Sequence, residues 1–224
     1  MKQYKSIDYW NKGIFGSPII AFDKLDGSNI RSEWNRKQSK NSNEGFNKYG
    51  TRRQLTSIQD EQWGNAVNLF MNKYSCQLNK IFREDKDFRN ARTITVFVEY
   101  YGSNSFAGWH NPNDKMDVTL FDIDVFQKGI LKPKDFIKKF EHLGIPDIIY
   151  EGNYNQSLID NVRNNVYDLS EGVVCKGITK TKRKKIEQIH MSKIKTIEWL
   201  QKVKKKYGQD KLLEELNGDK SLMI

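Results

Sequence analysis

The chain has 224 residues, of which 38 are Lys or Arg and 28 are Asp or Glu, and its formal net charge is +10. Its 12 Phe, 10 Tyr and 5 Trp provide enough aromatic surface to exclude a wholly disordered chain. No stretch approaches the roughly 18 apolar residues that span a bilayer. The opening segment MKQYKSIDYW lacks the apolar centre of a secretion signal. We therefore expect a soluble, cytoplasmic protein.

The first third of the chain predicts strands followed by a helix. Apolar and polar residues alternate through 18–34, which predicts two short strands on either side of a Gly-containing bend. The polar stretch 35–50 is expected to be an exposed connection. A helix is expected to begin at Ser57, with Asp60 as its capping partner and apolar positions continuing to Ile81.

The remainder of the chain alternates between the two kinds of element. Runs of β-branched and aromatic residues predict strands at 93–101 and 117–126. The further expected elements are helices at 133–142 and 158–166, a strand at 172–178 and a basic closing helix at 194–207. This order predicts one α+β domain built around antiparallel β-sheet.

Positive charge is concentrated late in the chain. Between Lys180 and Lys206 there are 11 Lys or Arg residues against Glu187 and Glu198. A surface of this kind attracts polyphosphate through counterion release, although a solvated lysine-rich face is the alternative. The two cysteines, Cys76 and Cys175, have no Cys or His at metal-ligand spacing, so we expect neither a disulfide nor a zinc site.

Four short strings carry residue types suited to phosphate chemistry. They are Lys24-Leu25-Asp26-Gly27, Glu99-Tyr100-Tyr101-Gly102, Glu171-Gly172-Val173-Val174-Cys175-Lys176 and Lys193-Ile194-Lys195. Each string alone is weak evidence. However, Lys24 follows an apolar run, so it is expected at the end of a core strand, where burial changes the pKa of an amine and makes it a candidate nucleophile.

Together and in this order, the strings resemble the covalent nucleotidyltransferase superfamily of ligases and capping enzymes, most closely the ATP-dependent RNA ligases of the phage and kinetoplastid-editing type. Ser28-Asn29 extends the lysine motif, Phe121-Asp122 follows Glu99 by about twenty residues, and Arg52-Arg53 falls where these ligases have an arginine. The resemblance covers residues 4–195 and implies a ligase adenylation domain with antiparallel β-sheets flanked by helices.

The resemblance also implies roles for single residues. Lys24 would attack the α-phosphorus of ATP and carry AMP covalently, and Lys193 and Lys195 would stabilise charge on the α-phosphate. Glu99 and Glu171 would hold magnesium or manganese, because carboxylates alone favour the ammonium form of Lys24 and a cation reverses that field. The implied nucleotide-binding residues are Phe22, Asp23, Asp26, Gly27, Asn29, Arg53, Phe121 and Lys176.

Some of these assignments have alternatives. Arg52 fits the arginine role as well as Arg53 does. Phe121 would otherwise be a core aromatic, and Lys176 a solvated strand lysine. Residues 1–195 would form the adenylyltransferase domain, and 196–224 a basic helical tail that is too short for an OB-fold. Trimming after Lys195 is therefore expected to spare adenylation and weaken ligation.

The implied function is an ATP-dependent RNA ligase that joins 5′-phosphate and 3′-hydroxyl ends through a lysyl-AMP intermediate and an adenylated 5′ end. Its partner would be RNA, including a nicked duplex, and the basic stretch would hold it. The protein would work in a host cytoplasm if the gene is viral. The alternatives are a minimal DNA ligase, a GTP-using capping-type guanylyltransferase, and a basic RNA-binding protein without enzymatic activity.

Overall fold

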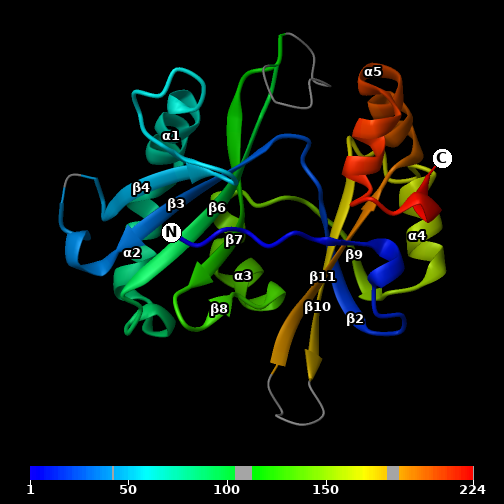
Figure 1. The fold of residues 1–224 in the computed structure, drawn as a ribbon. Helices are drawn as coiled ribbons and strands as arrows, with labels where there is room; N and C mark the ends of the chain where they lie inside the picture. The colour runs from blue at the N-terminus through cyan, green and yellow to red at the C-terminus, as the bar shows by residue number, and fades with distance from the viewer. Residues whose placement is uncertain (42, 104–112, 181–186, 224) are drawn as a thin grey trace. The chain divides into compact units, whose positions relative to one another are not determined.

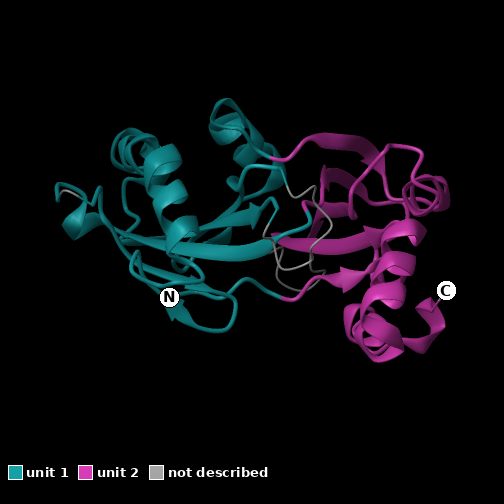
Figure 2. Ribbon diagram, turned by 90° about the horizontal axis from the view of Figure 1, so that it is seen from above, with its two compact units in different colours: residues 1–5, 26–145 teal, residues 6–25, 146–224 magenta. Residues whose placement is uncertain are grey.

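The computed structural model describes residues 1–41, 43–103, 113–180 and 187–223 (Figure 1). They divide into two compact units, shown in different colours in Figure 2. Unit 1 consists of Met1–Lys5 and Asp26–Ile145, and unit 2 of Ser6–Leu25 and Pro146–Ile224. The predicted division at residue 195 does not coincide with a boundary between these units. None of the described helices combines the length and the apolar character that a membrane crossing needs.

Unit 1 is built on a six-stranded antiparallel sheet. Its strand order is β5 (Leu55–Thr56), β4 (Phe46–Thr51), β3 (Ser28–Asn35), β6 (Thr93–Tyr101), β7 (Asp117–Val125) and β8 (Gly129–Ile130). The helices of this unit are α1 (Gly64–Phe70), α2 (Cys76–Glu84) and α3 (Pro133–Phe140), and a π-helical turn, Met71–Ser75, joins the first two.

The core of unit 1 lies between the helices and one face of the sheet. Phe70, Leu78 and Phe82 from the helical segment pack in one cluster with Trp34 of β3 and Val96 of β6, and all five are fully buried. Burial of such side chains removes about 1.5–3 kcal/mol of unfavourable hydration each. The other face of β3 and β6 carries mostly polar residues together with Phe97, because side chains alternate along a strand.

Unit 2 is built on a five-stranded sheet. Its strand order is β1 (Asp8–Tyr9), β11 (Glu187–Lys195), β10 (Gly172–Lys180), β2 (Pro18–Asp23) and β9 (Ile148–Asn153), and only the β1–β11 pair among these is parallel. Its helices are α4 (Gln156–Arg163) and α5 (Ile197–Glu215). Leu158 and Ile159 of α4 pack with Ala21, Val173 and Ile194 from the three central strands.

The two units confirm the predicted α+β class with antiparallel sheets. The strands predicted at 93–101 and 117–126 form as β6 and β7, and the helix predicted from Pro133 forms as α3. These segments agree because their own composition and pattern already favour the observed state.

Three local predictions were wrong. Residues 46–51, expected in an exposed connection, form β4, because pairing with β3 outweighs their polar composition. The helix expected from Ser57 begins at Gly64, since the Asp60 carboxylate accepts from the backbone N–H groups of Gln62 and Trp63 in a preceding turn. Residues 194 and 195, expected in the closing helix, instead end strand β11.

A glycine at residue 172 is required where β10 begins. Its φ is +151°, and a Cβ at this position would lie 2.0 Å from the carbonyl oxygen of Ile194. Gly218 also has a positive φ, +78°, but a Cβ there would meet no atom within 4 Å.

We therefore expect Gly172→Ala to lower the free energy of unfolding by about 2–4 kcal/mol, because it adds a clash to the backbone strain. Gly218→Ala should cost only about 1 kcal/mol, because strain acts alone. Urea unfolding of both variants measures the difference. Equal losses would show that the close approach of β10 and β11 is not a constraint.

Candidate functional site

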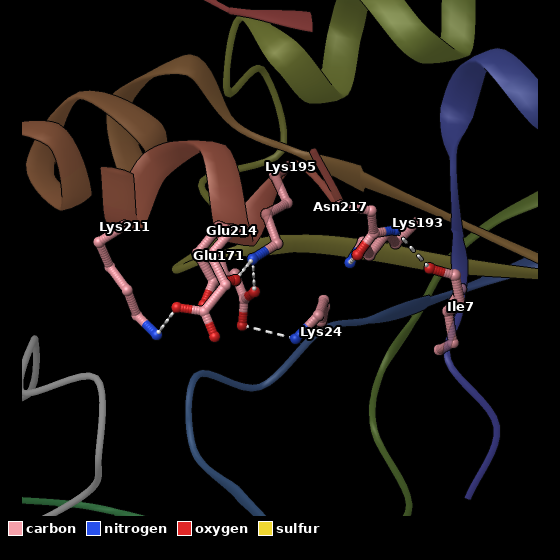
Figure 3. Close-up of polar contacts among 9 residues, drawn as sticks. Ile7, Lys24, Glu171, Lys193, Lys195, Lys211, Glu214 and Asn217 are labelled. Atoms are coloured by element: carbon pink, nitrogen blue, oxygen red, sulfur yellow. Dashed lines mark hydrogen bonds and ion pairs between the residues drawn. The ribbon is translucent and has the colours of Figure 1, made fainter. Parts of the chain in front are cut away.

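The side chain of Glu171 is the centre of a buried charge cluster in unit 2. Its Oε2 lies 2.7 Å from the Nζ of Lys24, and its Oε1 lies 2.8 Å from the Nζ of Lys195. The Glu171 side chain is 4% exposed, that of Lys195 is 2% exposed, and that of Lys24 is 23% exposed. Figure 3 shows the two lysines approaching this carboxylate from different segments of the chain.

Backbone hydrogen bonds fix the segments that carry these three side chains. The N–H of Lys24, just after β2, donates to the carbonyl of Gly172 at 2.9 Å. The N–H of Thr196, just after β11, donates to the carbonyl of Glu171 at 3.0 Å. The start of β10 is therefore held between the ends of β2 and β11, and the three strands deliver Lys24, Glu171 and Lys195 to one place.

Charge explains the ionisation of this cluster. Burial alone would raise the pKa of Glu171, but the ammonium groups of Lys195 and Lys24 outweigh burial and lower it below its ordinary value. Burial alone would likewise lower the pKa of Lys195, but the carboxylates of Glu171 and Glu215 raise it. Glu171 is therefore a carboxylate and Lys195 an ammonium group at neutral pH, and each of these two depends on its partners for that state.

Lys193 lies on β11, the strand that ends with Lys195, but its positive charge is poorly compensated by neighbouring carboxylates. Its Nζ is 4.6 Å from the centre of the Tyr9 ring and 3.4 Å from the Oδ1 of Asn217. Burial, followed by the like charges of Lys195 and Lys24, lowers its pKa to about 8. A cation in this state gains more from a bound anion than Lys195 does, because it has no carboxylate within ion-pair distance among the residues that the structure describes.

Lys176 of β10 and Phe22 of β2, two further residues that the sequence predicts to bind nucleotide, lie on adjacent strands of unit 2. Lys176 is 4% exposed, and its Nζ lies 5.0 Å from the centre of the Phe22 ring. The alternative that Lys176 is a solvated strand lysine is therefore wrong. Asp23, at the end of β2, has a pKa raised to about 6 by burial, then by the neighbouring charges of Asp147 and Glu171.

Three of the predicted residues of unit 1, Asn29, Glu99 and Phe121, lie on the face of its sheet that is turned away from the helices. Asn29 of β3 pairs in register with Glu99 of β6. Both polar atoms of the Asn29 amide are buried and make no hydrogen bond within the described part of the chain. A buried amide without partners is costly, so its presence points to a ligand that supplies them.

Phe121 lies on this same face of β7. Its ring centre is 5.0 Å from that of Tyr4 and 6.3 Å from that of Phe97, and its side chain is half-buried. The hydroxyl of Tyr4 donates to Asp122 at 2.7 Å. Asp122 thus holds the Tyr4 hydroxyl beside the Phe121 ring.

The other predicted residues of unit 1 differ in their surroundings. Gly27 lies where an added Cβ would be 2.4 Å from the carbonyl oxygen of Tyr100, so only glycine fits there. Asp26 is buried, at 3% exposed. Arg52 and Arg53 are both exposed in the turn between β4 and β5, and the structure does not favour either for the arginine role.

Sequence reasoning missed four residues that contact predicted ones. Tyr4 contacts Phe121, Tyr9 contacts Lys193, and the C-terminal residues Glu215 and Asn217 contact Lys195 and Lys193. Only Glu215 had a sequence signal, since it lies in the leucine-rich string LLEEL, which is typical of a helix with one buried face.

A divalent cation would have to fit around an occupied carboxylate. Each oxygen of Glu171 already accepts from a lysine, so direct ligation would displace Lys24 or Lys195. A cation held through its water shell fits better, because each carboxylate oxygen keeps a second lone pair. No group of three or more His, Cys, Asp or Glu side chains in the described ranges is arranged to bind a metal.

The basic stretch is only partly described. Residues 181–186 and the side chain of Lys180 lie outside the described residues. Within α5, Lys202, Lys204, Lys205 and Lys206 are all exposed, and Lys202 pairs with Glu198 at 2.7 Å.

Comparison with solved structures identifies the fold. No protein-family model matches the chain, and no curated protein has a significantly similar sequence. An RNA ligase of Naegleria gruberi, in a structure with PPi, superposes with a TM-score of 0.60 at 16% identity over 92% of this chain and 59% of that one. An archaeal ATP-dependent RNA ligase superposes with a TM-score of 0.61 at 14% identity, over 90% of this chain and 50% of that one.

A variant of the Naegleria gruberi ligase, in a structure with ATP and Mn, gives a TM-score of 0.60 at 14% identity, covering 88% of this chain and 57% of that one. The chain therefore shares the fold of the matched part of these RNA ligases, which agrees with the fold that the sequence resemblance implied. It spans 50–59% of the length of these ligases.

The two lysines of β11 should have opposite effects on stability. The pKa of Lys193 is depressed in the folded state, so the unfolded chain binds more protons between about pH 8 and its ordinary value, and stability rises with pH in that window. We expect Lys193→Met to stabilise the protein by on the order of 1 kcal/mol near pH 7, with the gain shrinking towards pH 10.

Lys195→Met is the matched comparison, because it leaves the Glu171 and Glu215 carboxylates without a shared partner and should destabilise the protein. Chemical denaturation at several pH values measures both effects. A destabilised Lys193→Met variant would show that Lys193 is not an undercompensated cation.

Proposed function

We propose that this protein is an ATP-dependent RNA ligase that joins 5′-phosphate and 3′-hydroxyl ends. The observation that carries the proposal is the lysine at the end of β2, held 2.7 Å from a buried glutamate whose other oxygen binds the second lysine of a Lys-x-Lys pair. The fold shared with RNA ligases supports it, as does the order of the motifs along the chain.

In the first step, the neutral amine of Lys24 attacks the α-phosphorus of ATP. A nitrogen–phosphorus bond forms, the bond from that phosphorus to the bridging oxygen of pyrophosphate breaks, and the proton of the amine passes to solvent. Pyrophosphate leaves with the electron pair, and AMP stays on Lys24. Lys193 is suited to hold the α-phosphate, because it is the cation of the cluster without a carboxylate partner among the described residues.

Unit 1 carries groups that are suited to binding a nucleoside. The half-buried ring of Phe121 presents a face for stacking on adenine, and the unpartnered amide of Asn29 can donate to and accept from ribose or phosphate. By the sequence resemblance, Glu99 and Glu171 are the carboxylates assigned to magnesium or manganese, an ion that when bound would neutralise phosphate charge.

The second and third steps would use the RNA. The 5′-phosphate of one end takes AMP from Lys24, and the 3′-hydroxyl of the other end then displaces AMP to form the phosphodiester. Positioning and charge neutralisation supply most of the rate in such transfers. The exposed lysines of α5, with residues 180–186 of the predicted basic stretch, would bind the RNA backbone.

Covalent labelling tests the first step. With α-labelled ATP and magnesium, the wild type should retain label through a denaturing gel, and Lys24→Ala should retain none, because the variant lacks the amine that would bond to phosphorus. Lys12→Ala, an exposed lysine of the same unit, is the control and should label as the wild type does. Label transferred from GTP and not from ATP would instead indicate a capping-type guanylyltransferase. If neither nucleotide labels the protein, a non-enzymatic RNA-binding protein is indicated.

Strand joining tests the substrate. We expect a nicked RNA duplex with a 5′-phosphate to be sealed faster than the matching DNA nick. Lys204→Gln together with Lys205→Gln should weaken RNA binding and lower its salt dependence while leaving lysyl-AMP formation within about twofold of wild type, since these side chains are exposed on α5. Faster sealing of DNA would favour a minimal DNA ligase.

A further inference from the structure

The last turns of α5 fold back towards the charge cluster of unit 2. The helix is interrupted at Gly208, whose φ of 84° and ψ of −178° are not helical. Beyond this break, Leu212 and Leu216 are fully buried. Because Glu215 lies between two buried leucines, core packing determines where its carboxylate points.

That carboxylate contacts Lys195. The Oε2 of Glu215 lies 2.8 Å from the Nζ of Lys195. The Oε1 of Glu171 lies at the same distance, 2.8 Å, from that nitrogen. The indole of Trp199 covers a further side of the ammonium, with the ring centre 3.6 Å away. Two N–H groups of Lys195 are thus engaged by carboxylates and its position is fixed by three neighbours.

The charge balance of the cluster depends on Glu215. Lys24, Lys193 and Lys195 bring three positive charges, and apart from Glu215 the carboxylate that the ion pairs of the described residues place against them is Glu171. Burying ammonium groups with so little compensation is unfavourable. The carboxylate of Glu215 supplies the second negative charge and raises the pKa of Lys195 together with Glu171.

The same carboxylate matters when Lys24 reacts. Lys24 must leave Glu171 and lose its proton before it can attack phosphorus, and Glu171 then keeps Lys195 as its ammonium partner. If Lys195 were held by Glu171 alone, the two would be free to shift together. Glu215 ties Lys195 to the core of α5, so Lys195 stays in place through this exchange.

We propose that Glu215 is a positioning residue for formation of lysyl-AMP: it holds Lys195, and through it Glu171, in the arrangement from which Lys24 reacts. This inference rests on the proposed ligase function. It also changes one expectation from sequence, because a chain trimmed after Lys195 would lose Glu215 and would form lysyl-AMP slowly.

The test is the single-turnover time course of lysyl-AMP formation with α-labelled ATP and magnesium, using the whole chain. Its amplitude counts the molecules that are competent to react, and its rate constant reports how well each of them reacts. A residue that only stabilises the fold changes the amplitude, whereas a positioning residue changes the rate constant.

We expect Glu215→Gln to lower the rate constant by at least about tenfold and to keep most of the amplitude, because a hydrogen bond to a charged group is lost in part. The matched control is Glu214→Gln, since Glu214 pairs with Lys211 at 2.7 Å and is 59% exposed. This variant should react within about twofold of wild type.

Three results would overturn the inference. They are a wild-type rate constant in Glu215→Gln, a loss of amplitude alone in that variant, and an equal fall in the rate constant of Glu214→Gln. If Glu215→Gln does not fold, Glu215→Asp keeps the charge but shortens its reach by one methylene. This variant should fold and react more slowly, and a wild-type rate constant would again contradict the proposal. Absence of lysyl-AMP in the wild type would overturn the proposed function itself, a result distinct from all of these.

Discussion

The carboxylate of Glu171 accepts from two ammonium groups at once, and the rest of unit 2 depends on this shared ion pair. Burial acts against the charge of Lys195, and the carboxylates of Glu171 and Glu215 outweigh it and raise the pKa of that lysine. The pair in turn constrains the backbone, since β2, β10 and β11 must end within reach of one side chain. Gly172 allows that approach, because any larger residue would meet the carbonyl of Ile194.

Function and stability are opposed within this cluster. Lys195 is matched by two carboxylates and strengthens the folded state, whereas Lys193, two residues earlier, stays charged at neutral pH with little compensation. A fold selected for stability alone would not keep such a cation. Asn29 shows the same pattern in unit 1, because its buried amide lacks partners in the described chain. Sites of this kind become favourable when a charged or polar ligand arrives.

The sequence predicted most of the strands and helices that local composition favours, and few of the contacts between segments that are distant along the chain. Strand β6 was predictable because nearly every residue from 93 to 101 is β-branched or aromatic, and the motif order pointed to Lys24 and Glu171. Strand β4 was not, because its polar residues owe their conformation to β3. The contact of Glu215 with Lys195 was also beyond prediction, since it depends on a reversal at Gly208 that local propensity does not specify.

The two units differ in how their residues are distributed along the chain. Most of unit 1 is one continuous segment, 26–145, whereas unit 2 joins 6–25 to 146–224. Strand β2, which precedes Lys24, pairs with β9 and β10, and these follow it by more than a hundred residues. During synthesis, therefore, unit 1 can fold on the ribosome while β2 still waits for its neighbours. Lys24 can therefore reach the arrangement with Glu171 and Lys195 only after residue 195 has emerged, well after unit 1 has been made.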